Sequence, residues 1–301
     1  MNEGIFSVPQ LPSGTVEFCV VSDIHIANDE PSSRAFTNQA RNDYVFAKNK
    51  TQSPISGEAY TLKRFCEKIN YSGRLGNFDD GRHKLILLGD IVNGECGYFA
   101  SYKSAAYKML SSSFMPWVHT GNIIYVCGNH DKNAKFYSVM TNIPRKFIYE
   151  NGYSEAGIEF RHGHEFDCLC NGRNVLGMMG DFASSAVVKL FSPYVEDLMR
   201  GRQFRHDKSD LNKVPDLRGL PSQATLQNMS GEAKRVAQNA IEYLSKRGDS
   251  HTIVCGHTHQ SPVQIDIMDK HYINSGKFAK NGYINVISKL RYPELGIWEL
   301  V

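Results

Sequence analysis

Apolar residues gather in five short runs, and each run ends at polar residues that can bind a cation or move a proton. The runs are rich in Val, Ile and Leu and stop at Gly, Asp or His, a pattern that predicts buried β-strands. They cover residues 18–22, 85–88, 123–127, 158–161 and 254–256. In open α/β sheets, ligands bind beyond the carboxyl ends of the strands, where several loops meet. We therefore expect the polar residues that follow these runs to form one site.

Helical periodicity separates the first three runs. Apolar residues recur at helical spacing in 62–69 and 98–112, and residues 132–140 continue the third run as a short helix. The alternation of strand and helix favours parallel strands joined by right-handed crossovers. This order predicts that the carboxyl ends of these strands lie at one edge of a sheet.

Two segments interrupt the alternation. The polar stretch 27–58 lacks a sustained period and is predicted to be a loop insertion. Residues 172–228 include a helical pattern at 182–199, broken at Pro193, and are predicted to form a helical cap over the strand ends. We treat residues 1–301 as a single domain that carries both insertions.

The C-terminal third predicts one more helix and several strands. A helix is expected at about 231–247, with Ser230 as its N-cap. Its apolar face comprises Ala233, Val236, Ala237, Ala240, Ile241 and Leu244. Apolar patterns at 263–267, 272–276, 284–287 and 296–300 predict antiparallel strands that complete a second sheet.

Composition narrows the class of protein. The net charge of +3 is too small to favour a stable nucleic-acid partner. The seven cysteines are odd in number, and Cys19, Cys127 and Cys255 lie in predicted core strands, which favours reduced thiols and a cytoplasmic location. The N-terminus does not resemble a secretory signal, and no run approaches the roughly 18 apolar residues of a membrane span.

The polar residues after the runs form a mixed set of nitrogen and oxygen donors. They are Asp23, His25, Asp90, Asn129, His130, Asp131, His162, His164, His257 and His259. Imidazole, carboxylate and amide groups together suit Mn²⁺, Fe²⁺ or Zn²⁺. In an extended segment, residues two apart point to the same side, so Asp23 with His25, and His257 with His259, can each converge. These ligands are too many for one ion, which predicts a binuclear site with a bridging carboxylate.

Each motif alone has a plain structural explanation. An Asp-x-His sequence is common by chance, and Gly-Asp at 89–90 is typical of a turn or a helix cap. The longer motifs at 128–131 and 256–259 are more specific, although either could also be a turn. The conjunction of five motifs in order, each at the end of an apolar run, favours a shared functional site.

The ordered series D-x-H, G-D, G-N-H-D, H-G-H and G-H-T-H resembles the calcineurin-like metallophosphoesterase superfamily over residues 23–259. The resemblance implies an α/β fold in which two mixed β-sheets form a sandwich flanked by helices, with an inserted helical cap. It implies a dinuclear metal-dependent phosphoesterase that hydrolyses a phosphodiester or pyrophosphate bond by attack of a metal-bridging hydroxide. Mn²⁺ is the expected metal, with Fe²⁺ or Zn²⁺ as alternatives.

The same resemblance assigns roles to individual residues. One cation would be held by Asp23, His25 and His259, the other by Asn129, His162 and His257, with Asp90 as the bridge. His130 would protonate the leaving group, and Asp131 would orient its imidazole. The family's ligand is the His before the Gly, so His164 is expected to be a pocket residue near the substrate or a bystander.

Details of the motifs bear on the substrate. The sequence G-D-I-V-N-G at 89–94 departs from the pattern of Ser/Thr protein phosphatases. The motif order, the cap and Y-x-N-S-G at 272–276 are similar to the UDP-2,3-diacylglucosamine pyrophosphatase branch, although that branch usually has H-G-D where this chain has H-G-H. A phosphorylated small molecule or a lipid-linked substrate such as UDP-2,3-diacylglucosamine is therefore the expected partner.

The basic run in the predicted cap has two interpretations. Arg202, Arg205 and Lys208 are candidates to bind substrate phosphate, and a solvated surface is the alternative. The cap could also contact a membrane surface peripherally. Alternative functions are a phosphomonoesterase, a cyclic-nucleotide or nucleic-acid phosphodiesterase, or a non-catalytic scaffold with the same fold. The complete ligand set favours catalysis, and the sequence does not define the oligomeric state.

Overall fold

Two β-sheets dominate the part of the chain that the computed structural model describes. The described residues are 15–24, 47–48, 54–55, 81–91, 114–131, 138, 141–167, 226, 229, 231–259, 262–276, 283–289 and 293–299. The strands are β1 (Glu17–Val21), β2 (Ala47–Lys48), β3 (Pro54–Ile55), β4 (His83–Leu88), β5 (Ile123–Val126), β6 (Ile148–Tyr149), β7 (Tyr153–Glu155), β8 (Ile158–Phe160), β9 (Thr252–Cys255), β10 (Val263–Ile267), β11 (Lys270–Asn274), β12 (Tyr283–Lys289) and β13 (Pro293–Glu299). The named helices are α6 (Gly231–Ser245) and the 3₁₀ turns η4 (Arg145–Phe147) and η5 (His164–Phe166).

The first sheet has six strands in the order β13-β12-β1-β4-β5-β6. The neighbours β1, β4, β5 and β6 are parallel, which confirms the prediction for the first three apolar runs. The strands predicted at 284–287 and 296–300 were expected in the second sheet, and that placement was wrong. They form β12, which pairs antiparallel with β1, and β13, which pairs antiparallel with β12 at the edge of the first sheet. This pairing covers an edge of β1 that would otherwise leave backbone groups unpaired.

The second sheet has five strands in the order β10-β11-β9-β8-β7. The runs predicted at 158–161 and 254–256 form the neighbours β8 and β9, which are parallel. The pairs β7–β8 and β10–β11 are antiparallel. Strand β11 lies between β10 and β9. It is antiparallel to β10 and parallel to β9, so the prediction of antiparallel strands holds for only one of its two neighbours.

The main core lies between the two sheets. It contains Phe18, Val20, Ile86, Leu88, Ile124, Val126, Ile158, Phe160, Val254 and Ile273, all buried. Alternate residues of each strand point into this layer, as the period of a strand requires. The rings of Phe18 and Phe160 meet across the layer with their centroids 4.9 Å apart. Burying each large apolar side chain contributes about 1.5–3 kcal/mol, so this layer holds the two sheets, and with them the ends of their strands, together.

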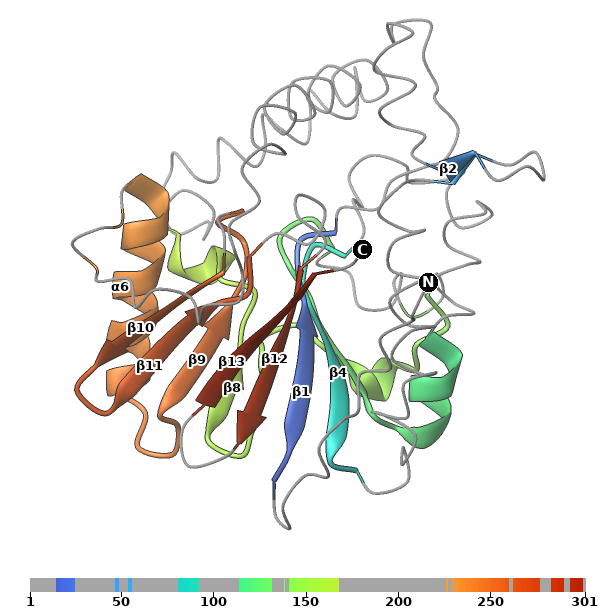
Figure 1. Cartoon of the computed structure of the whole chain (residues 1–301), viewed down its shortest axis with the longest axis horizontal. Coiled ribbons are helices and arrows are strands. Elements are labelled where there is room, and N and C mark those ends of the chain that lie inside the picture. Colours follow the sequence, from blue (N-terminus) through green and yellow to red (C-terminus); the bar gives the residue numbers. More distant parts are fainter. Residues whose placement is uncertain are drawn as a thin grey trace, which may run out of the picture.

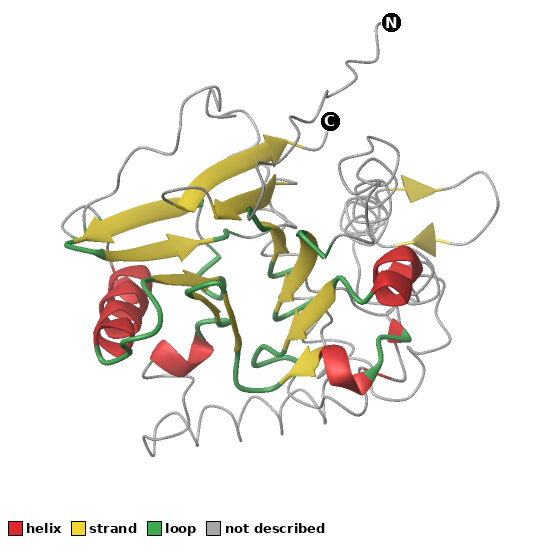
Figure 2. Cartoon of the chain, turned by 90° about the horizontal axis from the view of Figure 1, so that it is seen from below, coloured by secondary structure: helices red, strands yellow, loops and turns green. Residues whose placement is uncertain are grey.

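Helix α6 covers the outer face of the second sheet. Its buried residues are Val236, Ala237, Ala240 and Leu244, which confirms the predicted apolar face. They pack on Ile253 and Cys255 of β9 and on Tyr272 of β11. Figure 1 shows α6 beside β9–β11 and the helix 114–120 on the far side, beyond β4, and Figure 2 shows the same sheets turned by 90°. The sandwich with flanking helices thus confirms the expected fold class.

Several predicted elements lie outside the described residues. They include the helices at 62–69, 98–112 and 182–199, Ser230, most of 132–140 and nearly all of the cap at 172–228. Within the insertion at 27–58, β2 and β3 pair as a short antiparallel ribbon. The described cysteines Cys19, Cys127 and Cys255 are buried as reduced thiols, as expected for core positions. Among the described helices, none combines the length and apolar character needed to cross a membrane.

Candidate functional site

The ends of four strands, two from each sheet, bring candidate residues together. Asp23, Asp90, His162 and His257 each lie two residues after the last residue of β1, β4, β8 and β9. Backbone hydrogen bonds join the ends within each sheet, from Asp23 N–H to the Gly89 carbonyl (3.1 Å) and from Gly256 N–H to the His162 carbonyl (2.8 Å). The backbone N–H of His257 donates to Oδ2 of Asp23 at 3.0 Å and thereby connects the two sheets. The expectation of one shared site at these strand ends is therefore met.

The backbone is left-handed at four of the candidate site residues. The φ angles are +56° at Asp23, +50° at Asp90, +68° at His257 and +50° at His259. Residues with a Cβ rarely adopt this conformation, and such strain persists where the surrounding structure enforces it, often at functional sites. His257 and His259 therefore do not belong to an extended segment, and the expectation that they point to one side because of strand geometry was wrong.

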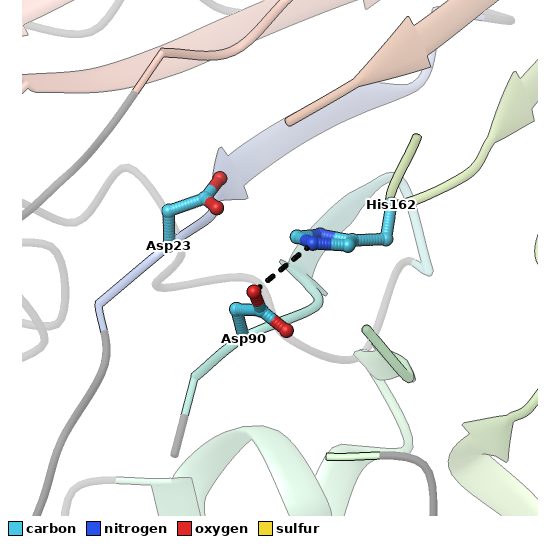
Figure 3. A group of neighbouring side chains, drawn as sticks. All are labelled: Asp23, Asp90 and His162. Atoms are coloured by element: carbon cyan, nitrogen blue, oxygen red, sulfur yellow. Dashed lines mark ion pairs between the residues drawn. The ribbon is translucent and has the colours of Figure 1, made fainter. Parts of the chain in front are cut away.

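Asp23, Asp90 and His162 form the centre of the site. All three are buried, and Figure 3 shows their side chains directed toward one another from different strand ends. Nε2 of His162 lies 3.2 Å from Oδ2 of Asp90. Nδ1 of His162 lies 2.9 Å from the carbonyl oxygen of Leu88, to which it donates. This hydrogen bond fixes the ring and directs Nε2 toward the carboxylates, the arrangement that metal-binding histidines use.

The charges of this centre call for a cation. Burial acts to lower the pKa of His162, but the carboxylates of Asp90 and Asp23 outweigh it and raise the pKa to about 10. Burial would raise the pKa of Asp23, yet His162 and His259 hold it well below its usual range. The buried carboxylate of Asp23 is thus held in its charged form, and the space between Asp23, Asp90 and His162 favours a positive charge. A divalent cation can take the place of the proton on His162, because a bound ion is often the largest local charge in such a site.

The residues present fit a divalent metal. The side-chain oxygen of Asn129 is buried and accepts no hydrogen bond from the described residues, which suits an oxygen ligand. The three side chains Asp23, Asp90 and His162 each place a ligand atom within 4.8 Å of the others. Carboxylate oxygens, an amide oxygen and imidazole nitrogens together are the donor set that Mn²⁺, Fe²⁺ and Zn²⁺ accept.

The two histidines of G-H-T-H contact different carboxylates. Nε2 of His259 lies 3.1 Å from Oδ1 of Asp23, at the centre of the site. Nε2 of His257 instead lies 3.5 Å from Oδ2 of Asp167 and 3.6 Å from Oε1 of Glu232. Burial and the neighbouring His162 lower the pKa of His257. His257, Asp167 and Glu232 thus form a second group whose candidate ligand atoms lie within 4.8 Å of one another.

His130 lies beside Asp90 at the more exposed side of the centre. Its backbone N–H donates to Oδ1 of Asp90 at 2.9 Å, and its Nε2 lies 3.9 Å from Oδ2 of the same residue. The imidazole is 30% exposed, whereas the Asp90 side chain is 2% exposed. A proton donor needs this kind of position, next to the reacting centre and open to a substrate.

Asp131 is buried and joins two of the loops. Its carboxylate accepts hydrogen bonds from the N–H of Ile91 (3.0 Å), the hydroxyl of Tyr125 (2.6 Å) and the N–H of Gly128. Burial and the charge of Asp90 raise its pKa to about 6. These contacts tie the loop after β4 to the loop after β5, and the role of Asp131 in orienting His130 stays a prediction.

Glycines before the candidate ligands are required for close approach. A Cβ at Gly256 would overlap the Ser22 hydroxyl and Oδ2 of Asp23, and a Cβ at Gly128 would overlap Oδ1 of Asp90. The glycine in each motif therefore lets the backbone of one strand end approach a carboxylate from another.

The remaining predicted residues are placed as follows. The ring centroid of His164 lies 5.6 Å from that of His162 and 6.4 Å from that of His257, so His164 lines the same region. Burial lowers the pKa of His164 to about 4, although the adjacent Glu165 acts in the opposite direction. His25, Arg202, Arg205 and Lys208 lie outside the described residues.

Three residues near the site were missed by sequence reasoning. Asp167 and Glu232 contact His257, yet neither belongs to a motif with ligand spacing. Asn274 donates from its amide to the Gly256 carbonyl and to the Thr258 hydroxyl, both at 3.0 Å. Its place in Y-x-N-S-G was the one available signal, and the motif was used there only to compare families.

The chain resembles known proteins in both sequence and fold. A sequence model of the calcineurin-like phosphoesterase family matches residues 16–261, well over half of the chain. Among solved structures, the chain is similar to a dimetal phosphatase from Danio rerio, with a TM-score of 0.42 and 11% identity, covering 95% of this chain and 99% of that one. It is also similar to the protein TT1561 of Thermus thermophilus, with a TM-score of 0.41 and 11% identity, covering 95% and 100% of the two chains. A search of curated proteins gives no match.

Proposed function

Because the chain belongs to the calcineurin-like phosphoesterase family and is thus a metal-dependent phosphoesterase, we propose that it hydrolyses phosphodiester or pyrophosphate bonds at this site. The family implies a dinuclear centre of divalent cations. The observation that carries the proposal is the pair of buried carboxylates, Asp23 and Asp90, whose side chains lie close to His162. Such a pair is costly to bury without a compensating cation.

The chain offers a ligand set on each side of Asp90. Asp23, His25 and His259 would hold one cation, Asn129, His162 and His257 would hold the other, and Asp90 would be shared between them. The contacts of His259 with Asp23 and of His162 with Asp90 support this division, since each pair already shares one region of the site. Mn²⁺ is the proposed metal, because the set combines oxygen and imidazole donors.

Residues of the chain supply the other catalytic roles. Divalent cations at such a centre supply a water-derived nucleophile at neutral pH and offset the negative charge of the phosphoryl group. His130 gives a proton to the leaving-group oxygen, and its exposure beside Asp90 supports that role. Asp131 fixes the loop that carries His130 through its bonds to Ile91, Tyr125 and Gly128.

The proposed substrate is a nucleotide-linked lipid or sugar, of which UDP-2,3-diacylglucosamine is one example. The motif order and Y-x-N-S-G at 272–276 support this choice. His164, close to both His162 and His257, contacts the substrate. In this proposal, Arg202, Arg205 and Lys208 bind its phosphates, and the cap at 172–228 also meets a membrane surface peripherally. The buried, reduced thiols of Cys19, Cys127 and Cys255 support a cytoplasmic location.

Metal removal and return test the proposed activity. The purified protein is stripped with chelator and assayed on bis-p-nitrophenyl phosphate, p-nitrophenyl phosphate and UDP-linked sugars, before and after addition of Mn²⁺. We expect hydrolysis of the diester or the pyrophosphate to vanish on stripping and to return with Mn²⁺. The metal content should approach two ions per chain. A folded protein that holds less than one ion per chain and hydrolyses none of these compounds would be a scaffold, which contradicts the proposal.

A further inference from the structure

The Y-x-N-S-G segment carries a buried amide that contacts the G-H-T-H loop. Asn274 is the last residue of β11 and is completely buried. Its Nδ2 lies 3.0 Å from the Gly256 carbonyl and 3.0 Å from the Thr258 hydroxyl. Its Oδ1 accepts a hydrogen bond from the N–H of Gly276 at 2.9 Å. The amide thus connects the G-H-T-H loop with the loop after β11, and its Nδ2 also lies 3.2 Å from the hydroxyl of Tyr272.

The loop that Asn274 contacts needs external support. His257 and His259, the residues on either side of Thr258, both have left-handed φ angles. A non-glycine residue in this conformation costs of order 1–3 kcal/mol, and the strain persists only where neighbouring groups over-determine it. Asn274 contacts the residue before His257 and the residue between the two histidines. Its two hydrogen bonds therefore act on the segment where the strain lies.

Further hydrogen bonds hold the end of β11 and the G-H-T-H loop in place. In the parallel register of β9 and β11, Asn274 lies opposite Cys255, the last residue of β9. The N–H of Ser275 donates to the Cys255 carbonyl at 2.7 Å, so the end of β11 is held against the end of β9. From the other sheet, Asp23 accepts a hydrogen bond from the His257 N–H. The loop is thus hydrogen-bonded both to a carboxylate at the end of the first sheet and to an amide at the end of the second.

We propose that Asn274 is a positioning residue that holds His257 and His259 in their metal-binding conformation through Gly256 and Thr258. The inference rests on the proposed function, because it concerns two ligands of the proposed metal centre. It gives Y-x-N-S-G a physical role: its Asn bridges two strand ends, and its Gly276, at φ +71°, turns the chain so that its N–H reaches Oδ1 of Asn274.

The test compares a variant that removes the side-chain amide of Asn274 with a variant that keeps it. Asn274→Asp preserves shape but places a carboxylate oxygen against the Gly256 carbonyl, so the loop loses its brace and meets repulsion. Tyr272→Phe is the matched control, because it removes only the hydroxyl that lies 3.2 Å from Nδ2. Each chelator-stripped protein is titrated with Mn²⁺ by calorimetry and with Co²⁺ by visible absorption, and its folding is checked by circular dichroism.

We expect Asn274→Asp to bind Mn²⁺ roughly 10–100-fold more weakly than wild type, the usual effect of losing a group that orients a metal ligand. The Co²⁺ absorption bands should also shift, because the ligand geometry changes, which a general loss of stability would not cause. Tyr272→Phe should match the wild type in both measurements. Folded Asn274→Asp with wild-type affinity and an unchanged Co²⁺ spectrum would overturn the inference.

A second variant keeps the test decisive. If Asn274→Asp does not fold, Thr258→Val removes the hydroxyl that accepts from Asn274 and leaves both histidines in place. Weaker Mn²⁺ binding by Thr258→Val supports the inference, and wild-type binding overturns it. The wild-type titration separates the two proposals: a wild-type protein that binds no divalent cation refutes the metal centre itself, whereas metal binding that ignores Asn274 and Thr258 refutes only their positioning role.

Discussion

Nε2 of His162 lies 3.2 Å from Oδ2 of Asp90, so that a histidine at the end of one sheet meets a carboxylate at the end of the other. The contact forms where the parallel pairs β1–β4 and β8–β9 both end. Asp23 and Asp90 follow strands of the first sheet, whereas His162 follows a strand of the second. The chemistry of the site therefore depends on how the core layer between the sheets holds them together.

Replacing Asp90 by Asn should remove the bridge between the two cations. The amide keeps the size of the side chain but loses the charge that holds a second cation. We expect Asp90→Asn to retain no more than one ion per chain and to lose hydrolysis of a diester substrate, measured by elemental analysis after dialysis and by steady-state assay. Asp249→Asn is the matched control, because Asp249 is an exposed acid outside the site. Two retained ions and normal turnover in Asp90→Asn would contradict the bridging role.

Much of this centre could be predicted from local sequence. Short Val- and Ile-rich runs fix β1, β4, β5, β8 and β9, because strand formation at a buried position depends on residues close in the chain. The local pattern alone therefore places the polar residues that follow each run at strand ends. Asp23, Asp90 and His162 meet as that reasoning expected.

What sequence could not give depends on distant pairing or on backbone conformation. The patterns of β12 and β13 predict strands, but the choice of β1 as partner depends on which edge is open. The left-handed φ of His257 occurs in a loop that is hydrogen-bonded to Asp23 and to Asn274, which lie elsewhere in the sequence. For the same reason, no spacing rule could indicate that Asp167 faces His257.

Asp167 and Glu232 should contribute unequally to metal binding through His257. Both carboxylates approach Nε2 of His257, but Asp167 is 3% exposed and Glu232 is 48% exposed. A buried carboxylate orients an imidazole and raises its basicity, whereas water competes at the exposed one. We expect Asp167→Asn to weaken Mn²⁺ binding by about 10–100-fold, and Glu232→Gln to weaken it less. Calorimetric titration of both stripped variants checks the order, and equal or reversed effects would refute it.

Tyr125 should stabilise the fold through the carboxylate of Asp131. Its hydroxyl donates to Oδ2 of Asp131 at 2.6 Å, and both residues are completely buried. A hydrogen bond to a charged acceptor contributes about 1.5–3 kcal/mol, so Tyr125→Phe should lower the free energy of unfolding by that amount. Tyr153→Phe is the control, because its hydroxyl donates to the more exposed Glu155 at 2.6 Å. Urea denaturation of both variants measures the difference, and a smaller loss for Tyr125→Phe than for Tyr153→Phe would contradict the expectation.

His130 should affect turnover without affecting metal content. It lies beside Asp90, with its Nε2 at 3.9 Å from Oδ2, and it is not among the proposed ligands. Removing a general acid typically lowers the rate by about 10²–10⁴-fold, so His130→Ala should show a loss in kcat of that size. The loss should shrink for a substrate whose leaving group is a good one, such as p-nitrophenolate, because that group departs with less help from a proton. Elemental analysis should find the wild-type number of ions in the variant. If turnover of a poor leaving group stays normal, His130 is not the proton donor, and if the ions are lost, it is a ligand instead.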